Sequence, residues 1–125
     1  MNPISYREIQ ALAEKYSEKL IAFRRHLHAN PELSFQEYKT SAFIQEALAS
    51  AGIAFNSKIA GTGILAEVSG SADGKTIALR GDMDALPIQE ENHCDYSSNN
   101  AGVMHACGHD VHSTCIYGAA LIVQE

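Results

Sequence analysis

The sequence predicts an α/β fold made of two helices, then strands, then a further helix. Two stretches near the start repeat apolar residues at intervals of three and four, which is the pattern of a helix with one buried face. Two short runs rich in Ile, Leu and Val follow and are typical of strands, and a third helical pattern covers the last residues. The chain has 125 residues, 46% of them hydrophobic, which suits one globular unit with a modest core.

The first helix is expected to follow Ser5 and to end at Asn30-Pro31. Ser5 and Glu8 have the spacing of a capping box, and the residue before a proline disfavours helical backbone. The apolar residues that define its buried face are Ile9, Leu12, Tyr16, Leu20, Phe23 and Leu27.

Similar signals delimit the other two helices. Ser34 and Glu37 repeat the capping-box spacing, and Gly52 offers a C-terminal cap for the second helix. Asp110 is expected to cap the third helix, whose apolar positions run almost to the end of the chain. This helix stops with no glycine and no closing strand, so we expect an incomplete domain that belongs to a larger protein.

The strand signals lie in "GILAEVSG", residues 63–70, and "KTIALRGDMDAL", residues 75–86. Asp73-Gly74 between them is a favourable hairpin turn, so the two runs are expected to pair. The "GTG" that precedes them has no lysine and no helix after it, and we therefore interpret it as a turn between strands and not as a phosphate loop.

Several polar residues have structural interpretations. Residues 87–106 are polar and show no period, which predicts a long loop, and Glu90 and Glu91 within it are expected to be solvated. His26 and His28 lie two apart on the first helix and face different ways, so packing or dipole roles are expected for them.

The charge and the cysteine content indicate which classes of partner and which cellular compartment to expect. A net charge of -6 argues against nucleic acid and against an anionic membrane surface, which leaves small molecules or proteins as partners. The start of the chain lacks a signal-peptide pattern, and no run approaches the roughly 18 apolar residues of a membrane span, which favours a cytoplasmic protein. An odd number of cysteines predicts free thiols at Cys94, Cys107 and Cys115.

The stretch "HACGHDVHST", residues 105–114, is the strongest functional signal. Cys107 and His109 flank a glycine on a looped backbone, so both side chains can reach one ion, and thiolate and imidazole are ordinary zinc ligands. His112 follows one helical turn after His109 and can line the same cavity. Asp110 adds a carboxylate at the positive end of the helix dipole.

A second constellation is "LRGDMDALP", residues 79–87. Asp82 and Asp84 are two residues apart, so their side chains are expected on the same face at the carboxyl end of the second expected strand. Ligand sites of α/β sheets are commonly found at that end. Two neighbouring carboxylates repel each other, so a cation nearby would stabilise them. Arg80 is expected to point to the other face. A surface turn is the alternative interpretation.

Together these motifs resemble the N-terminal part of the metal-dependent amidohydrolases of the aminoacylase and carboxypeptidase superfamily. The branch comprises N-acyl-amino-acid amidohydrolases, hippurate hydrolases and indole-acetyl-amino-acid hydrolases. "RGDMDALP" is followed after some fifteen residues by "GVMHACGHDVH", and "FRRHLHANPELSFQEYKT" and "GTGILAEV" come before them in the same order as in the family. The resemblance implies that residues 1–125 are part of a zinc-peptidase-like α/β/α catalytic domain.

The resemblance also implies roles for individual residues. Cys107 matches the thiolate that bridges two metal ions, and His109 matches a ligand to one of them. Asp84 matches the catalytic-site aspartate that orients a ligand. Asp82 occupies the place where related peptidases have a metal-binding histidine, so it is assigned, with Asp110 and His112, only to the lining of the site.

The family's remaining machinery is expected outside this chain. The resemblance places the general base in a downstream Glu-Glu pair, together with further ligands and a dimerisation domain that is absent here. The 125 residues alone are therefore expected to be inactive, to bind metal weakly, and to self-associate as a homo-oligomer. The expected cofactor is two divalent ions, zinc or manganese, and the expected substrates are N-acyl amino acids or related peptides.

Two other hypotheses stay open at this point. Cys107 could be a nucleophile with His109 or His112 as its base, or the chain could be a non-catalytic metal-binding or interaction module. The acyl group, the amino-acid preference and the physiological metal do not follow from the sequence.

Overall fold

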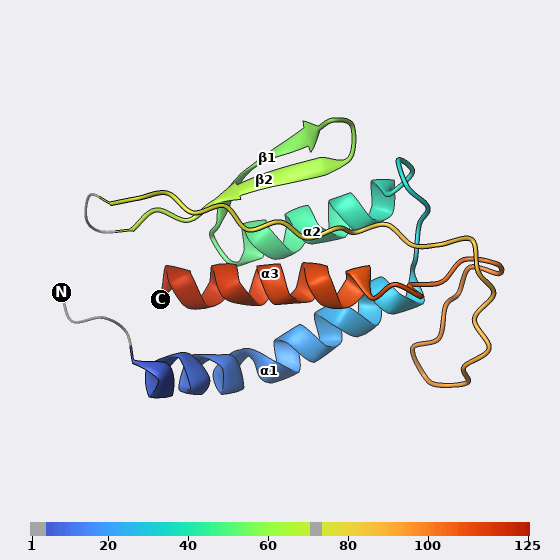
Figure 1. Cartoon of the computed structure of the whole chain (residues 1–125), viewed down its shortest axis with the longest axis horizontal. Helices are drawn as coiled ribbons and strands as arrows, with labels where there is room; N and C mark the ends of the chain where they lie inside the picture. Colours follow the sequence, from blue (N-terminus) through green and yellow to red (C-terminus); the bar gives the residue numbers. More distant parts are fainter. Residues whose placement is uncertain (1–4, 71–73) are drawn as a thin grey trace.

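The computed structural model describes residues 5–70 and 74–125, which form three helices and a two-stranded sheet (Figure 1). The elements in chain order are α1 (Tyr6–Ala29), α2 (Tyr38–Ser50), β1 (Ala54–Ile59), β2 (Gly63–Glu67) and α3 (His109–Gln124). The expected order of two helices, strands and a helix is confirmed. A long connection between β2 and α3 carries most of the polar motifs.

The core forms where the three helices meet. In Figure 1, α3 lies between α1 and α2, and the hairpin formed by β1 and β2 covers the other side of α2. The ring of Phe23 in α1 stacks on Tyr117 in α3, with centroids 4.6 Å apart, and also contacts Phe43 of α2. Burial of apolar side chains here supplies the main stabilising term. The buried members of the cluster are Phe23, Leu27, Leu48, Ile53, Tyr117 and Leu121.

The first helix begins and ends where the sequence predicts. The backbone N–H of Glu8 donates to the Ser5 hydroxyl, and the Glu8 carboxylate accepts from the Ser5 backbone N–H, which completes the capping box. The helix ends at Ala29, with Asn30 as its C-cap.

The prediction of a second capping box, at Ser34 and Glu37, was wrong. Glu37 itself is the N-cap of α2, and its side chain makes no capping hydrogen bond; the Glu32 carboxylate accepts from the backbone N–H groups of Lys39 and Thr40 in the first turn instead. The Ser34 hydroxyl donates to Asp84, and the Glu37 carboxylate accepts from the Thr62 hydroxyl and the Phe35 backbone N–H. Both side chains therefore bind distant partners, which outcompete the local cap.

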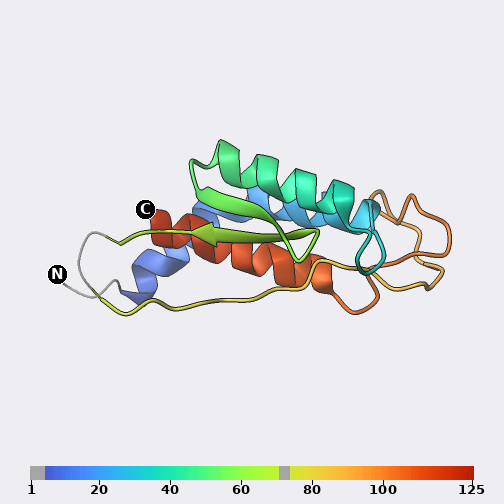
Figure 2. The same ribbon diagram turned by 90° about the horizontal axis from the view of Figure 1, so that it is seen from above.

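The strand pair was also placed wrongly, because β2 pairs with the preceding β1. The two are antiparallel with Phe55 opposite Ala66, and Gly61, at φ 104°, lies in the turn that the "GTG" predicts. The proposed hairpin turn at Asp73-Gly74 falls partly outside the described residues. Residues 74–84 are extended but form no ladder with β2, and run along α3 instead (Figure 2).

Hydrogen bonds to other parts of the chain hold the end of this segment and the residues after it. The Asp82 carbonyl accepts from the Ser113 hydroxyl of α3 at 2.8 Å, and Ala85 donates to the Glu32 carbonyl. Leu86 exchanges two backbone hydrogen bonds with Met104. These bonds satisfy backbone groups of residues 82–86 without a neighbouring strand.

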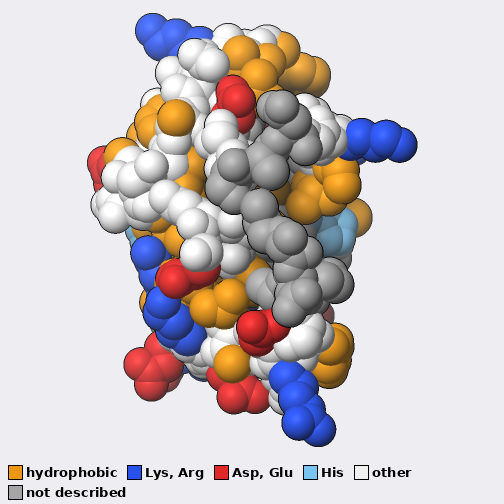
Figure 3. All heavy atoms as spheres, turned by 90° about the vertical axis from the view of Figure 1, so that its left-hand side faces the viewer, with side chains coloured by type: hydrophobic (Ala, Val, Ile, Leu, Met, Phe, Trp, Pro, Cys, Tyr) orange, Lys and Arg blue, Asp and Glu red, His pale blue; other side chains and the backbone are white. Residues whose placement is uncertain are grey.

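The surface is mixed in character. Apolar side chains reach it in several separate places between charged ones on the face shown in Figure 3, and Ile77 and Leu79 of the extended segment are exposed. Among the helices of the described residues, none has both the length and the apolar character that crossing a membrane requires.

Candidate metal centre

Asp82, His109 and His112 form a cluster with the composition of a metal site. Each offers one ligand atom, and the three atoms lie within 4.8 Å of one another. Asp82 comes from the extended segment, and both histidines come from the first turn of α3. The imidazole rings are 5.4 Å apart between centroids. The structure thus joins the two motifs that the sequence singled out.

The start of α3 determines how the histidines are presented. Gly108 is the N-cap of α3, with left-handed backbone at φ 83°, and no side chain caps the helix. The expected capping role of Asp110 was therefore wrong: this residue lies inside the first turn, and its carboxylate is fully buried against α1. His109 and His112 are about 60° apart around the helix axis and so share one face.

Asp84 fixes the orientation of His109. The Nδ1 atom of His109 lies 2.8 Å from Asp84 Oδ1 and 2.9 Å from the Asp84 carbonyl oxygen. Both oxygens are acceptors, so Nδ1 carries a proton, and Nε2 is the ring atom left to bind a metal. Hydrogen bonds from the Ser34 hydroxyl and then from His109 hold the pKa of the Asp84 carboxyl below its usual value.

Asp82 has an ion-pair partner that the sequence interpretation excluded. The Arg80 guanidinium bonds the Asp82 carboxylate, and Arg80 is largely exposed. The expectation that Arg80 faces away was wrong, because residues two apart on an extended chain lie on the same face. This exposed pair is weak, so a divalent ion can compete with Arg80 for the carboxylate.

Cys107 stands apart from the cluster. Its thiol is exposed, and the three ligand atoms that converge do not include it. In the described part of the chain no hydrogen bond joins Cys107 to His109 or His112. The pairing of Cys107 with His109 as ligands of one ion is therefore not formed in this structure. Cys94 and Cys115 are free thiols as well, as expected.

A buried network of charged side chains lies behind the cluster, and the sequence analysis missed it. His28 of α1 places Nδ1 2.8 Å from Asp110 Oδ2 and Nε2 3.1 Å from Glu90 Oε1. Arg24 donates to the same Asp110 oxygen at 2.9 Å. Glu90 is buried, so its expected solvation was wrong, whereas Glu91 is exposed as expected. The i, i+4 spacing of Arg24 and His28 was the available signal.

The other residues of the histidine motifs have separate surroundings. His26 stacks on Phe43 at 3.8 Å between centroids, which agrees with the expected packing role. His105 is buried, and neither of its ring nitrogens has a partner among the described residues. Burial lowers the pKa of His105, and the charge of Asp110 partly opposes this. The pKa of Glu90 is lowered chiefly by the backbone N–H of Ser98.

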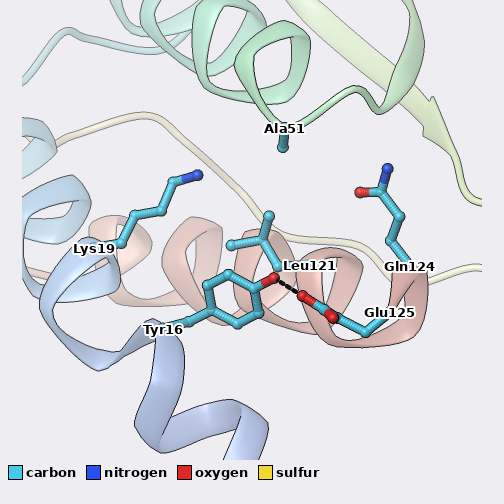
Figure 4. Close-up of a pocket in the computed structure, with 6 residues that line it drawn as sticks. All are labelled: Tyr16, Lys19, Ala51, Leu121, Gln124 and Glu125. Carbon is cyan, nitrogen blue, oxygen red and sulfur yellow. Dashed lines mark hydrogen bonds between the residues drawn. The ribbon is translucent and has the colours of Figure 1, made fainter.

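A pocket of about 370 Å³ lies at the other end of α3 (Figure 4). Tyr16 and Lys19 of α1 face Leu121 and the last residues of α3, and the Tyr16 hydroxyl donates to Glu125. Sixteen residues of α3 span about 24 Å, so this pocket is remote from the histidines. It contains no cluster of metal-ligating side chains, and we do not assign the chemistry to it.

The donor set fits a divalent metal. Two imidazoles and a carboxylate are the ligand types that zinc and related ions use in catalytic sites, which have three protein ligands and one open position. The Asp84–His109 contact is the carboxylate–histidine arrangement that supports such ligands. The three ligand atoms lie within 4.8 Å of one another, close to the spacing of atoms that bind one ion at about 2.0–2.2 Å.

Comparisons with known proteins agree with this composition. Residues 78–125 match the model of peptidase family M20/M25/M40. The chain is 49% identical over 118 residues to the N-acyl-L-amino acid amidohydrolase of Geobacillus stearothermophilus, covering 94% of this chain and 32% of that protein. It is 52% identical over 106 residues to the N-acetyldiaminopimelate deacetylase of Oenococcus oeni, covering 81% of this chain and 28% of that protein.

The fold is similar to that of solved relatives. The crystal structure of a dinuclear metal binding peptidase of the M20 family from Bacillus subtilis superposes with a TM-score of 0.85 at 43% identity. The match covers 89% of this chain and 32% of that one. The chain thus spans about a third of the length of the relatives that it matches.

Proposed function

Because the chain corresponds to the N-terminal third of peptidase family M20 proteins, we propose that the protein to which it belongs is a metal-dependent amidohydrolase. Its substrates are N-acyl amino acids or related small peptides, and the bond cleaved is the amide. The names of the relatives, an N-acyl-L-amino acid amidohydrolase and a deacetylase of an acetylated amino acid, support this substrate class.

The observation that carries the proposal is the convergence of Asp82, His109 and His112, with Asp84 behind His109. We assign metal binding to the first three residues. Asp84 holds the proton on Nδ1 of His109 and so directs the Nε2 lone pair at the ion. When bound, a divalent metal polarises the substrate carbonyl and activates water for attack on it.

The ligand types and the free thiols support a choice of metal and of compartment. Zinc and manganese both suit carboxylate and imidazole ligands, and a contribution from the Cys107 thiolate favours zinc. For Cys107 to hold metal together with His109, its side chain would have to turn toward that histidine. Three free, exposed cysteines fit a reducing compartment, which supports a cytoplasmic protein.

A chelator and an alkylating agent together test the proposal on the whole protein. We expect a strong metal chelator to abolish hydrolysis of N-acetyl and N-benzoyl amino acids, and added zinc or manganese to restore it. Cys107→Ala should lose most of the rate, while Cys94→Ala, which changes an equally exposed thiol away from the cluster, should keep it.

The opposite pattern would support the thiol hypothesis instead. Full activity in the presence of chelator, combined with complete inactivation by alkylation, would mean that Cys107 is a nucleophile and not a ligand. Full activity of Cys107→Ala would remove this residue from the site altogether.

A further inference from the structure

We propose that the buried network of Arg24, His28, Glu90 and Asp110 is a positioning device for the metal cluster: it sets the rotation of the first turn of α3 and hence where His109 points. The inference rests on the proposed metal site. It assigns a function to four residues that bind no substrate and no metal in that proposal.

The network joins three separate parts of the chain through groups that are costly to bury. The exposed fraction of the side chain is 6% for His28, 3% for Glu90 and 0% for Asp110. His28 is held at both ring nitrogens: Nδ1 lies against Asp110 Oδ2 and the Arg24 guanidinium, and Nε2 lies against Glu90 Oε1. Buried charges persist only when they are paired, so each member restricts the position of the others.

The helical geometry links this network to the cluster. With 3.6 residues per turn, His112 lies about 160° and His109 about 100° from Asp110 around the axis of α3. The Asp110 carboxylate is held by α1, so the histidines are turned toward Asp82 and Asp84. Rotation of this turn would move both histidines away from the extended segment.

Among the described residues, no side-chain cap takes this role at the start of α3. Gly108 has no side chain, and the hydrogen bond from the Ser113 hydroxyl to the Asp82 carbonyl is only partly buried. The hydrogen bond between His109 and Asp84 is partly solvated, whereas the ties of Asp110 are buried. Functional constellations need positions accurate to about 0.5 Å, which requires buried support of this kind.

The matched pair Glu90→Gln and Glu91→Gln tests the proposal, with Asp110→Asn as a second network variant. Glu90 and Glu91 are neighbours in one loop, but only the first is buried and bonded to His28. Zinc ions alone are the probe, and calorimetry on the full chain gives their dissociation constant. The nitrogen and proton NMR signals of the His109 imidazole, recorded without metal, report its hydrogen bond to Asp84.

We expect both network variants to bind zinc about tenfold more weakly and to lose the hydrogen-bonded Nδ1 signal of His109. Glu91→Gln should match the wild type in both measurements. Circular dichroism and cooperative urea unfolding check that the variants are folded. Unchanged zinc affinity and an unchanged His109 signal in folded variants would overturn the inference, and so would the loss of folding in both, since the network would then act on the fold alone.

The NMR readout separates this inference from the proposed function. If the wild-type chain binds no zinc, the metal site fails as proposed. The His109 signal in the metal-free variants still decides whether the network sets the orientation of that ring.

Discussion

The contact between Asp84 and His109 makes a quantitative prediction for the variant Asp84→Ala. The substitution removes the carboxylate that accepts from Nδ1 at 2.8 Å but leaves the Asp84 backbone carbonyl at 2.9 Å. Loss of such a supporting partner typically weakens metal binding by about 10- to 100-fold. Because the carbonyl still accepts from Nδ1, we expect the lower end, about tenfold, which equals about 1.4 kcal/mol.

The effect on stability should be smaller than the effect on binding. The side chains of Asp84 and His109 are 23% and 16% exposed, so water can replace part of the lost hydrogen bond. A net loss of about 1 kcal/mol in the free energy of unfolding is expected. The variant therefore separates a defect in the site from a defect in the fold.

Zinc titration by calorimetry and urea unfolding of the metal-free chain measure the two quantities. Ser34→Ala is the matched control, because it removes the other hydrogen bond to the Asp84 carboxylate and leaves the His109 contact in place. We expect this control to bind zinc within about threefold of the wild type, well short of the loss for a partner of the ligand itself. Wild-type zinc affinity in Asp84→Ala would refute the view that Asp84 orients a ligand.

Two further predictions concern pH and association. Burial lowers the pKa of His105, so near pH 6.5 the unfolded chain binds a proton at this residue and the folded chain does not. The neutral ring therefore contributes to stability fully above about pH 6.5, and this contribution is lost as the pH falls below that value. Urea unfolding at pH 7 and pH 5 should show this loss, and His105→Phe should reduce it; an equal loss in the variant would contradict the assignment. The exposed apolar side chains Ile77 and Leu79, 82% and 62% exposed, should drive self-association into a homodimer or larger assembly, which light scattering would detect and Leu79→Asp should weaken. A monomer at millimolar concentration would contradict this.

The helices could be predicted because their signals are local. The capping box of Ser5 and Glu8 and the apolar spacing through Phe23 and Leu27 act within a few residues, and tertiary structure reinforces them. The cap at Ser34 failed for the opposite reason. Its hydroxyl bonds to Asp84, fifty positions away, and no local pattern reveals that contact.

The site was predictable in composition but not in geometry. Scarce histidines and paired aspartates marked the two stretches, and the structure brings Asp82 to His109 and His112. The burial of Glu90 was hidden, because a glutamate in a polar loop is usually solvated. Its partner His28 lies on a helix 62 positions earlier, and only the folded chain brings the two together.

Gly108 divides the Cys-Gly-His stretch into two arms that differ in how they are held. The arm that begins with His109 belongs to α3 and is anchored through Asp110, while Cys107 on the other arm is exposed and outside the cluster. A left-handed backbone costs other residues roughly 1–2 kcal/mol, whereas glycine crosses between backbone regions with little steric hindrance. Torsion about this one residue moves the thiol relative to the imidazole without unwinding a helical turn. In the proposed metal site, Cys107 would therefore reach the ion through a change at Gly108 alone, with the first turn of α3 left in place.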